Sequence, residues 1–190
     1  LAGAYRHLGR LEEALPLLEE ARTRQERLTG KSHPDYAATV LALASVLGRR
    51  NQLDEARKLV TELVERTRAE EGEAYPGLPQ RLQGLAVLEH AAGNFSAAEG
   101  AAREALERSQ SWTERVMESQ AERRQLALAA SQARMLHAYL AIAVDAGEFA
   151  EEAYRFTLRH KGSAWMQQRR LRAAADDPAA APLFLELQRT

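Results

Sequence analysis

The sequence contains no cysteine, and only 6% of its 190 residues are aromatic. The absence of cysteine excludes disulfides, zinc sites built on thiolates and cysteine nucleophiles from this chain. It also fits a reducing compartment, so we expect a cytoplasmic location. The scarcity of aromatic, valine and isoleucine side chains disfavours β-sheet, because strands are enriched in these residues.

The chain also lacks an excess of charge of one sign. Its 26 basic and 27 acidic residues give a net charge of −1, so there is no overall attraction to nucleic acid or to anionic lipid. No apolar run approaches the roughly 20 residues of a membrane-spanning helix, and we recognise no signal peptide. The first residue is not Met, and Leu1 already lies in a helical pattern. We therefore expect the chain to be part of a longer polypeptide.

Ala, Leu, Glu and Arg dominate the composition, and these strong helix formers predict an all-α fold. Apolar and small residues recur with a fixed period, which is the sequence signature of a repeat architecture. A spacing of 42 residues separates the members of each of five sets, namely Leu1, Leu43 and Leu85; Leu11, Leu53 and Phe95; Ala14, Ala56 and Ala98; Gly30 and Gly72; and Pro34 and Pro76.

Each repeat reads as a helix, a tight turn and a second helix. The turns are placed at Gly9, Asn51 and Gly93, because glycine and asparagine tolerate the left-handed conformation that ends a helix. The repeated alanines follow the turns, where two antiparallel helices approach most closely, and Leu11, Leu53 and Phe95 are expected to fill the base of each hairpin. A hairpin cannot bury its apolar face alone, so the hairpins should stack into a solenoid.

The segments between repeats carry helix stop and start signals. Gly30 is expected to end one helix, and Pro34 and Pro76 suit the first turn of the helix that follows. Ser32 is a weak candidate for the N-terminal cap of the helix that starts near Pro34.

These repeats resemble the tetratricopeptide repeat, and the 42-residue period with Gly30, His33 and Pro34 between units resembles its kinesin-light-chain type. The resemblance covers residues 1–110 and implies three helical hairpins in a right-handed superhelical solenoid. Glu89 departs from the pattern, because a large apolar residue is expected there. The matching residues are Leu1, Ala2, Tyr5, Leu11, Ala14, Leu18 and Ala21 in the first unit, Leu43, Ala44, Leu47, Leu53, Ala56 and Val60 in the second, and Leu85, Ala86, Phe95, Ala98 and Ala102 in the third.

Residues 111–190 break the period. Apolar spacing predicts one long helix from Glu114 to Ala146, followed by a turn at Gly147 that repeats the turn at Gly93 after 54 residues. We expect a fourth hairpin whose first helix is about three turns longer, and a short terminal helix in the segment PLFLELQ.

Residues 120–190 resemble the helical segment that precedes the protease domain of CHAT proteins, which are caspase-like and separase-like peptidases. The resemblance implies that residues 111–190 link the solenoid to a C-terminal domain that this chain does not include. This chain has no Cys to receive the family's catalytic role, so no residue of the segment is assigned to catalysis. The pattern comprises Ala153, Tyr154, Arg159, Lys161 and Gly162, an Arg-Arg-Leu-Arg run, and Asp177-Pro178.

No motif for a metal or a cofactor is present. The five histidines form no H-E-x-x-H or other close pair, and His33 is expected to cap or pack rather than to bind metal. Adjacent carboxylates such as Glu12 and Glu13 point in different directions on a helix and are typical of a solvated face. We therefore predict no metal, no cofactor and no catalytic residue.

The stretch from Arg155 to Ala175 contains no acidic residue. A basic stripe could bind nucleic acid, but few aromatic residues interleave with it, so base stacking has little to use. We favour a charged outer face or a docking face for an acidic partner. Trp165 is more simply explained by packing between helices than by an interface.

The concave groove of a solenoid is its best candidate binding site, because the first helices of several repeats line it together. The repeat register places polar candidates for partner binding at Arg6, Ser45, Arg49, Gln83 and His90. They would favour an acidic or hydrogen-bonding peptide. The alternative, that these side chains are merely solvated, stays open.

These patterns predict a protein–protein interaction scaffold that binds a protein, a peptide or its own C-terminal domain. By the second resemblance it would be the regulatory or sensing region of a CHAT-type protease. Two alternatives remain, a substrate-recruiting part of an enzyme and a regulatory tail of a transcription activator. Partners in a membrane are not expected, and nucleic acid is disfavoured.

Overall fold

The structure is a computed structural model that describes residues 2–116, 122–147 and 154–158. The chain divides into two compact units, Leu1–Glu148 and Phe149–Thr190. In the second unit the structure describes one short helical stretch, residues 154–158. The first unit contains α1 (Ala2–His7), α2 (Leu11–Thr29), α3 (Pro34–Arg49), α4 (Leu53–Glu71), α5 (Leu78–Ala91), α6 (Phe95–Val116) and α7 (Glu122–Asp145).

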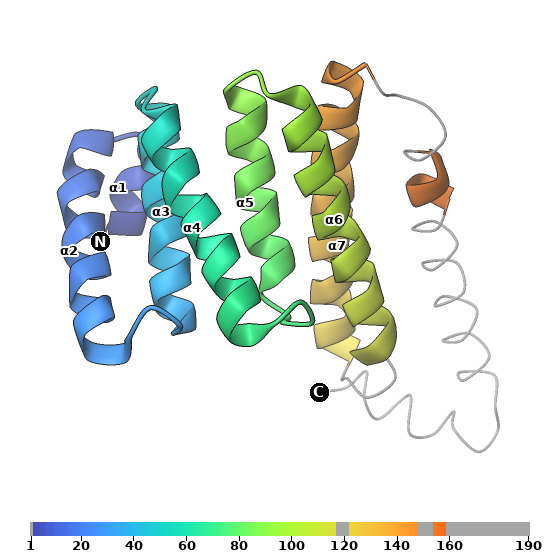
Figure 1. Cartoon of the computed structure of the whole chain (residues 1–190), viewed down its shortest axis with the longest axis horizontal. Helices are drawn as coiled ribbons and strands as arrows, with labels where there is room; N and C mark the ends of the chain where they lie inside the picture. The colour runs from blue at the N-terminus through green and yellow to red at the C-terminus, as the bar shows by residue number, and fades with distance from the viewer. Residues whose placement is uncertain (1, 117–121, 148–153, 159–190) are drawn as a thin grey trace. The chain divides into compact units, whose positions relative to one another are not determined.

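The helices of the first unit pack in chain order (Figure 1). Each contacts the next one along the chain, and α3 also contacts α5, as α5 contacts α7. The first helices of successive hairpins therefore lie against one another, which is the arrangement predicted for stacked repeats. No strand occurs within residues 2–116, 122–147 and 154–158, in agreement with the predicted all-α class.

The turns within the hairpins share one geometry. Gly9, Asn51, Gly93 and Gly147 have φ values of 75°, 63°, 78° and 73°, so the asparagine adopts the left-handed conformation predicted for it. After each of the first three, an amide donates to the carbonyl five residues earlier at 2.9 Å, namely Arg10 to Tyr5, Gln52 to Leu47 and Asn94 to Glu89. This is the Schellman motif, which satisfies carbonyls that the end of a helix leaves free.

The three repeated alanines occupy equivalent, closed sites. Ala14, Ala56 and Ala98 are each 0% exposed, as expected where the two helices of a hairpin approach most closely. Leu11 and Leu53 pack against the core, as predicted. The prediction for Phe95 was wrong, because its side chain is 41% exposed and packs edge-on against His90, with ring centroids 5.5 Å apart.

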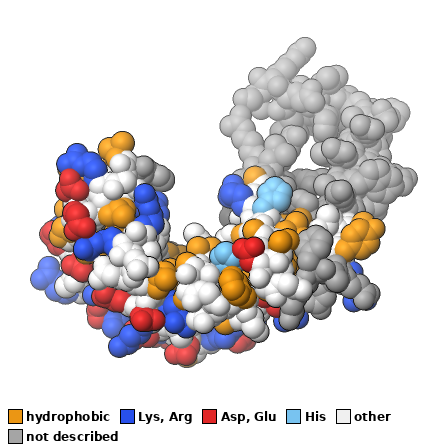
Figure 2. Space-filling view, turned by 90° about the horizontal axis from the view of Figure 1, so that it is seen from above, with side chains coloured by type: hydrophobic (Ala, Val, Ile, Leu, Met, Phe, Trp, Pro, Cys, Tyr) orange, Lys and Arg blue, Asp and Glu red, His pale blue; other side chains and the backbone are white. Residues whose placement is uncertain are grey.

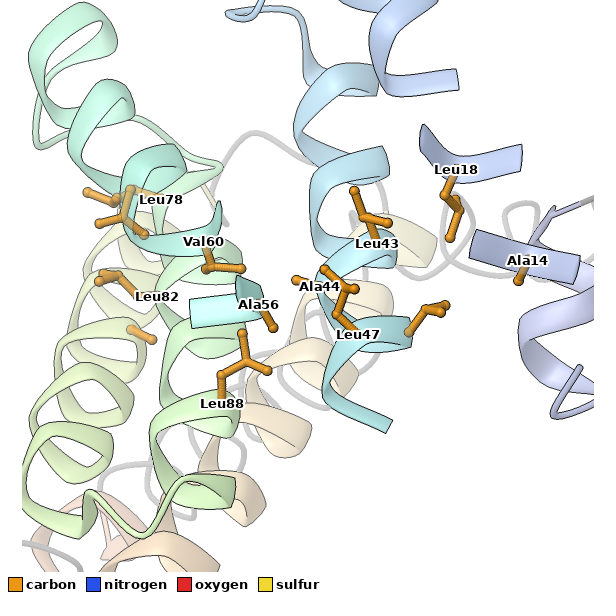
Figure 3. Packing of buried hydrophobic residues seen from close by; sticks show 13 residues of the cluster. Ala14, Leu18, Leu43, Ala44, Leu47, Ala56, Val60, Leu78, Leu82 and Leu88 are labelled. Atoms are coloured by element: carbon orange, nitrogen blue, oxygen red, sulfur yellow. The ribbon is translucent and has the colours of Figure 1, made fainter. Parts of the chain in front are cut away.

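One apolar cluster runs through successive hairpins and joins them (Figure 3). Its members come from different hairpins, and Leu43, Val60 and Leu78, from α3, α4 and α5, are each at most 2% exposed. Burying one such side chain stabilises the fold by about 1.5–3 kcal/mol. Each hairpin supplies only part of the cluster, so the stability of a hairpin depends on the neighbouring hairpins.

The boundaries between hairpins agree with the sequence in part. Gly30 and Gly72 follow α2 and α4 with φ values of 82° and 81°, and Pro34 is the first residue of α3. The placement of Pro76 was wrong, since α5 begins at Leu78 and it is Pro79 that lies in its first turn.

The N-terminal cap of α3 also differs from the prediction. His33 is the cap, because its Nδ1 accepts a hydrogen bond from the amide of Asp35 at 3.2 Å. Ser32 instead donates to Glu70 at the end of α4, at 2.6 Å. The short serine side chain therefore links two hairpins rather than capping one helix.

The long helix predicted from Glu114 to Ala146 was wrong at its start. Residues 114–116 belong to α6, and α7 begins at Glu122. The predicted lengthening is present, because α7 has 24 residues against 14 in α5, a difference of about three turns. The continuation of this hairpin, Trp165, most of the basic stretch and the predicted terminal helix lie outside the described residues.

The predicted division into residues 1–110 and 111–190 stays a prediction, and α6 runs through its boundary without a break. Among the helices that the structure describes, none is both long and apolar enough to cross a membrane.

Candidate functional site

A hollow of about 460 Å³ lies between α3 and α5. Figure 2 shows the first unit hollowed in its middle, with a floor of mostly apolar and uncharged side chains. The lining residues are Leu41, Ala44, Ser45, Gly48, Arg49, Leu53, Val60, Gln80, Gln83, Gly84, Val87, Leu88 and Ala91. Three of the four predicted binding residues on these two helices are among them.

Small residues bring α3 and α5 close together beneath this hollow. A Cβ atom added at Gly84 would lie 2.8 Å from Cδ2 of Leu41, which is closer than two carbon atoms pack. Val87 also lines the hollow and is 53% exposed. The hollow therefore offers a shallow apolar floor that water covers in the free chain, and a partner's apolar side chain would displace that water.

Three of the five predicted binding residues meet in this hollow. Ser45 and Arg49 come from α3, and Gln83 comes from α5. The Arg49 guanidinium donates from Nη1 to the carbonyl oxygen of Arg6 at 2.9 Å, so it is held at the end of α1. Arg6 thus contributes through its main chain and is not part of the lining.

The remaining predicted residue, His90, lies elsewhere. Its Nε2 is 2.7 Å from Oδ2 of Asp145, a contact that joins α5 to α7. Since His90 does not line the α3–α5 hollow, the structure separates it from Ser45, Arg49 and Gln83. Sequence register placed it on the correct helix but could not supply its partner on α7.

Glu89, which departs from the repeat pattern, takes part in a contact between hairpins. It is 8% exposed and pairs with Nη2 of Arg57 on α4 at 3.0 Å. It also accepts a hydrogen bond from the side chain of Asn94 at 2.7 Å. The hydrogen bond to Glu89 raises the pKa of Arg57. At this position an ion pair between hairpins therefore takes the place of the apolar contact that the repeat pattern predicts.

No group of three or more His, Asp or Glu side chains within the described part of the chain is arranged to hold a metal ion. His33 caps α3, as one of its two expected roles, and His90 pairs with Asp145. The chemistry that the hollow offers is therefore hydrogen bonding, apolar contact and one guanidinium.

The family profile of the tetratricopeptide repeat matches residues 1–69 and 36–111. Together the two matches cover more than half of the chain and include both helices that form the hollow. No curated protein matches the sequence significantly.

Solved structures of similar fold extend over most of the chain. The crystal structure of BtubC (BKLC) from P. vanneervenii superposes with a TM-score of 0.67 at 20% identity, covering 87% of this chain and 61% of that one. The chain therefore spans less than two thirds of that structure. Two crystal structures of Podosopora anserina putative kinesin light chain nearly identical TPR-like repeats, one of a variant, give TM-scores of 0.50 and 0.51 at 19% and 18% identity. Each covers 88% of this chain, which covers 93% of each.

At these identities the likeness concerns the fold alone. It agrees with the predicted all-α solenoid of antiparallel hairpins and with its kinesin-light-chain-like character.

Proposed function

Because this chain belongs to the tetratricopeptide repeat family, we propose that it is a protein-interaction scaffold whose α3–α5 hollow holds a segment of a partner protein. The observation that carries this proposal is the position of Ser45, Arg49 and Gln83 around one open, mostly apolar hollow. Such a site suits an extended or helical peptide, because several repeats can contact it at once.

The chemistry of the hollow indicates what the segment would offer. Leu41 and Val87 would accept an apolar side chain, and burial of that side chain would supply most of the binding free energy. Ser45 and Gln83 would exchange hydrogen bonds with the partner's main chain. Arg49 keeps further donors beyond the one that Arg6 accepts, and these suit a carboxylate.

Exposed side chains on the next hairpin, one of them an arginine, favour the same kind of partner. Counted back from the turn glycines, Arg134 and His137 on α7 occupy the places of Gln80 and Gln83 on α5. Both side chains are exposed, as Arg49 is. A partner segment with acidic residues next to an apolar one would match this surface.

The finer form of the proposal places this scaffold in a CHAT-type protease of the cytoplasm, as its regulatory or sensing region. Its support is the resemblance of residues 120–190 to the segment that precedes such a protease domain. The groove would then bind either a partner or the downstream domain itself. Reading the residues that follow Thr190 tests this form, because a CHAT domain requires paired His and Cys motifs there.

Peptide selection tests the groove. Peptides chosen from a displayed random library would be measured by calorimetry against the wild-type chain and against Val87→Glu and Arg49→Glu. Each variant places a carboxylate in the hollow, so we expect at least a tenfold loss of affinity for acidic peptides, or about 1.4 kcal/mol. Lys58→Glu, an equal charge reversal at an exposed position of α4, should leave the affinity unchanged.

Circular dichroism would establish that all three variants keep the helical fold. Selected peptides that bind Val87→Glu and Arg49→Glu as tightly as the wild type would refute the groove as the binding site.

A further inference from the structure

A second hollow, of about 360 Å³, lies at the corner where the α4–α5 loop meets the end of α6. Tyr75 and Trp112 supply two aromatic rings to its wall, and Pro76 and Pro79 supply apolar ring surface. Glu73, Glu107 and Arg108 are its charged lining residues. This corner pocket has no part in the groove between α3 and α5, since the two share no lining residue.

The charges in the corner pocket leave one carboxylate without a partner. Arg108 donates from Nε to Glu104 at 2.7 Å, and its Nη2 lies 2.5 Å from Oε2 of Glu73. The other oxygen of Glu73 is 3.5 Å from Nε of Arg68. Glu107 is exposed and forms no hydrogen bond or ion pair with any residue whose placement the structure describes. The lining therefore carries one uncompensated negative charge.

The preceding repeat provides an internal comparison, because its corner is built on the same framework. Arg66 donates to the carbonyl of Lys31 at 2.9 Å, as Arg108, 42 residues later, donates to the carbonyl of Glu73 at 2.7 Å. Six of the nine lining positions of the later corner differ from the residues 42 positions earlier, and three of these changes make the later corner more aromatic or more acidic. Lys31, His33 and Glu70 become Glu73, Tyr75 and Trp112.

The two corners therefore differ in character. Polar side chains bond to one another in the earlier corner, whereas aromatic side chains line an open hollow in the later one. In the earlier corner the Glu70 carboxylate accepts a hydrogen bond from the Ser32 hydroxyl at 2.6 Å. In the later corner Trp112 stands at the position of Glu70 and lines a hollow. The framework does not require this change, because the same arginine-to-carbonyl bond forms in both corners.

We propose that the corner pocket binds the cationic side chain of a lysine or arginine of a partner protein. A cation over an aromatic face is attracted by the ring quadrupole, and Trp is the strongest such ring. Arg81 already lies over the ring of Tyr75, 4.9 Å from its centroid, so Trp112 is the ring left for a ligand. The Glu107 carboxylate would neutralise the bound charge, and the prolines would pack against its alkyl stem.

The occupant is a side chain of a protein rather than a small amine, because a further hollow connects the pocket with the groove. That hollow, of about 350 Å³, shares Gln80 and Gln83 with the groove and Pro76 and Trp112 with the corner pocket. A segment that leaves the groove can follow it to the corner. This choice of occupant rests on the proposed function, whereas the affinity of the pocket for a cation does not.

Nuclear magnetic resonance tests the pocket directly. The indole N–H signal of Trp112 would be assigned by comparison with Trp112→Phe, and the chain would be titrated with Nα-acetyl-lysine N-methylamide at constant ionic strength. We expect a saturable shift of the Trp112 signal, and a much smaller one with the neutral Nε-acetylated analogue. Glu107→Gln should weaken lysine binding by about threefold.

Glu65→Gln is the matched control, since Glu65 is exposed and occupies the register of Glu107 one repeat earlier. It should leave lysine binding unchanged, as should Val87→Glu in the groove. Absence of a shift, an equal shift with the neutral analogue, or equal affinities of Glu107→Gln and Glu65→Gln would each overturn the proposal. If the chain binds the lysine compound but its groove binds no selected peptide, the corner pocket stands and the proposed function alone is refuted.

Discussion

At the scale of single residues, small side chains set how closely the helices approach. Ala14, Ala56 and Ala98 are fully buried in three equivalent places, each four residues after the amide-donating residue of a turn. Gly84 does the same between α3 and α5, where a methyl group would collide with Leu41. The size of these residues, rather than their hydrophobicity alone, explains why they recur.

Enlarging one of these alanines should therefore destabilise the chain. Ala56→Leu adds three carbon atoms at a site with no exposed surface, and we expect a loss of about 1–3 kcal/mol in the free energy of unfolding. Urea denaturation followed by circular dichroism would measure it. Ala69→Leu, at an exposed position of the same helix, should change stability little, and equal losses in the two variants would contradict this account.

At the scale of elements, charged side chains on the outer helices join one hairpin to the next. Glu104 on α6 accepts hydrogen bonds at 2.6 and 2.7 Å from Nη2 of Arg68 on α4, and one at 2.7 Å from Arg108. Partial burial raises the pKa of Glu104, but the hydrogen bonds from Arg68 and Arg108 outweigh it, so the pKa lies below its usual value. The carboxylate is therefore more stable as an ion in the folded chain.

A lowered pKa in the folded state makes stability depend on pH in one direction. The contribution of Glu104 is complete above its unfolded pKa, near 4.5, and is lost as the pH falls through the lower folded pKa. Glu104→Gln should reduce stability by about 1–2 kcal/mol at neutral pH, and the difference from wild type should shrink below about pH 4.5.

Urea titrations at several pH values would measure that difference. Glu62→Gln is the control, because Glu62 has the same register one repeat earlier and is exposed. A difference between wild type and Glu104→Gln that stays constant down to pH 2 would refute the assigned role of the ion pair.

At the scale of the whole molecule, the first unit is a linear stack in which helices contact mainly their neighbours. Contacts join each helix to the next one and join α3 to α5 and α5 to α7. In such an array stability is a sum of terms within repeats and between neighbouring repeats. The shortest of these helices is α1, which has six residues, and none of its side chains at residues 2–6 is buried.

Opening should therefore begin at α1. Hydrogen–deuterium exchange followed by mass spectrometry should find α1 exchanging first and α4 and α5 last, since both of these are enclosed by helices on either side. Val60→Ala, in the centre of the stack, should accelerate exchange of both α4 and α5 more than of α1. Equal protection of all the helices would mean that the unit opens as one block, contrary to this expectation.

The repeat architecture follows from the sequence, because it depends on local signals that recur in phase. The turns at Gly9, Asn51 and Gly93 and the alanines that follow them need only backbone conformation and side-chain size to be placed. The same register put Ser45, Arg49 and Gln83 on one face, and they line one hollow.

Contacts between residues of different repeats were decided by the tertiary structure. Glu89 could be recognised as unusual in the sequence, but its partner Arg57 is 32 positions away on another helix, and no period links the two. His90 likewise faces Asp145, and Tyr75 and Trp112 line one pocket across 37 positions. Periodicity specifies which face a residue lies on, whereas distances across hairpins depend on how the stacked helices pack, which no local signal encodes.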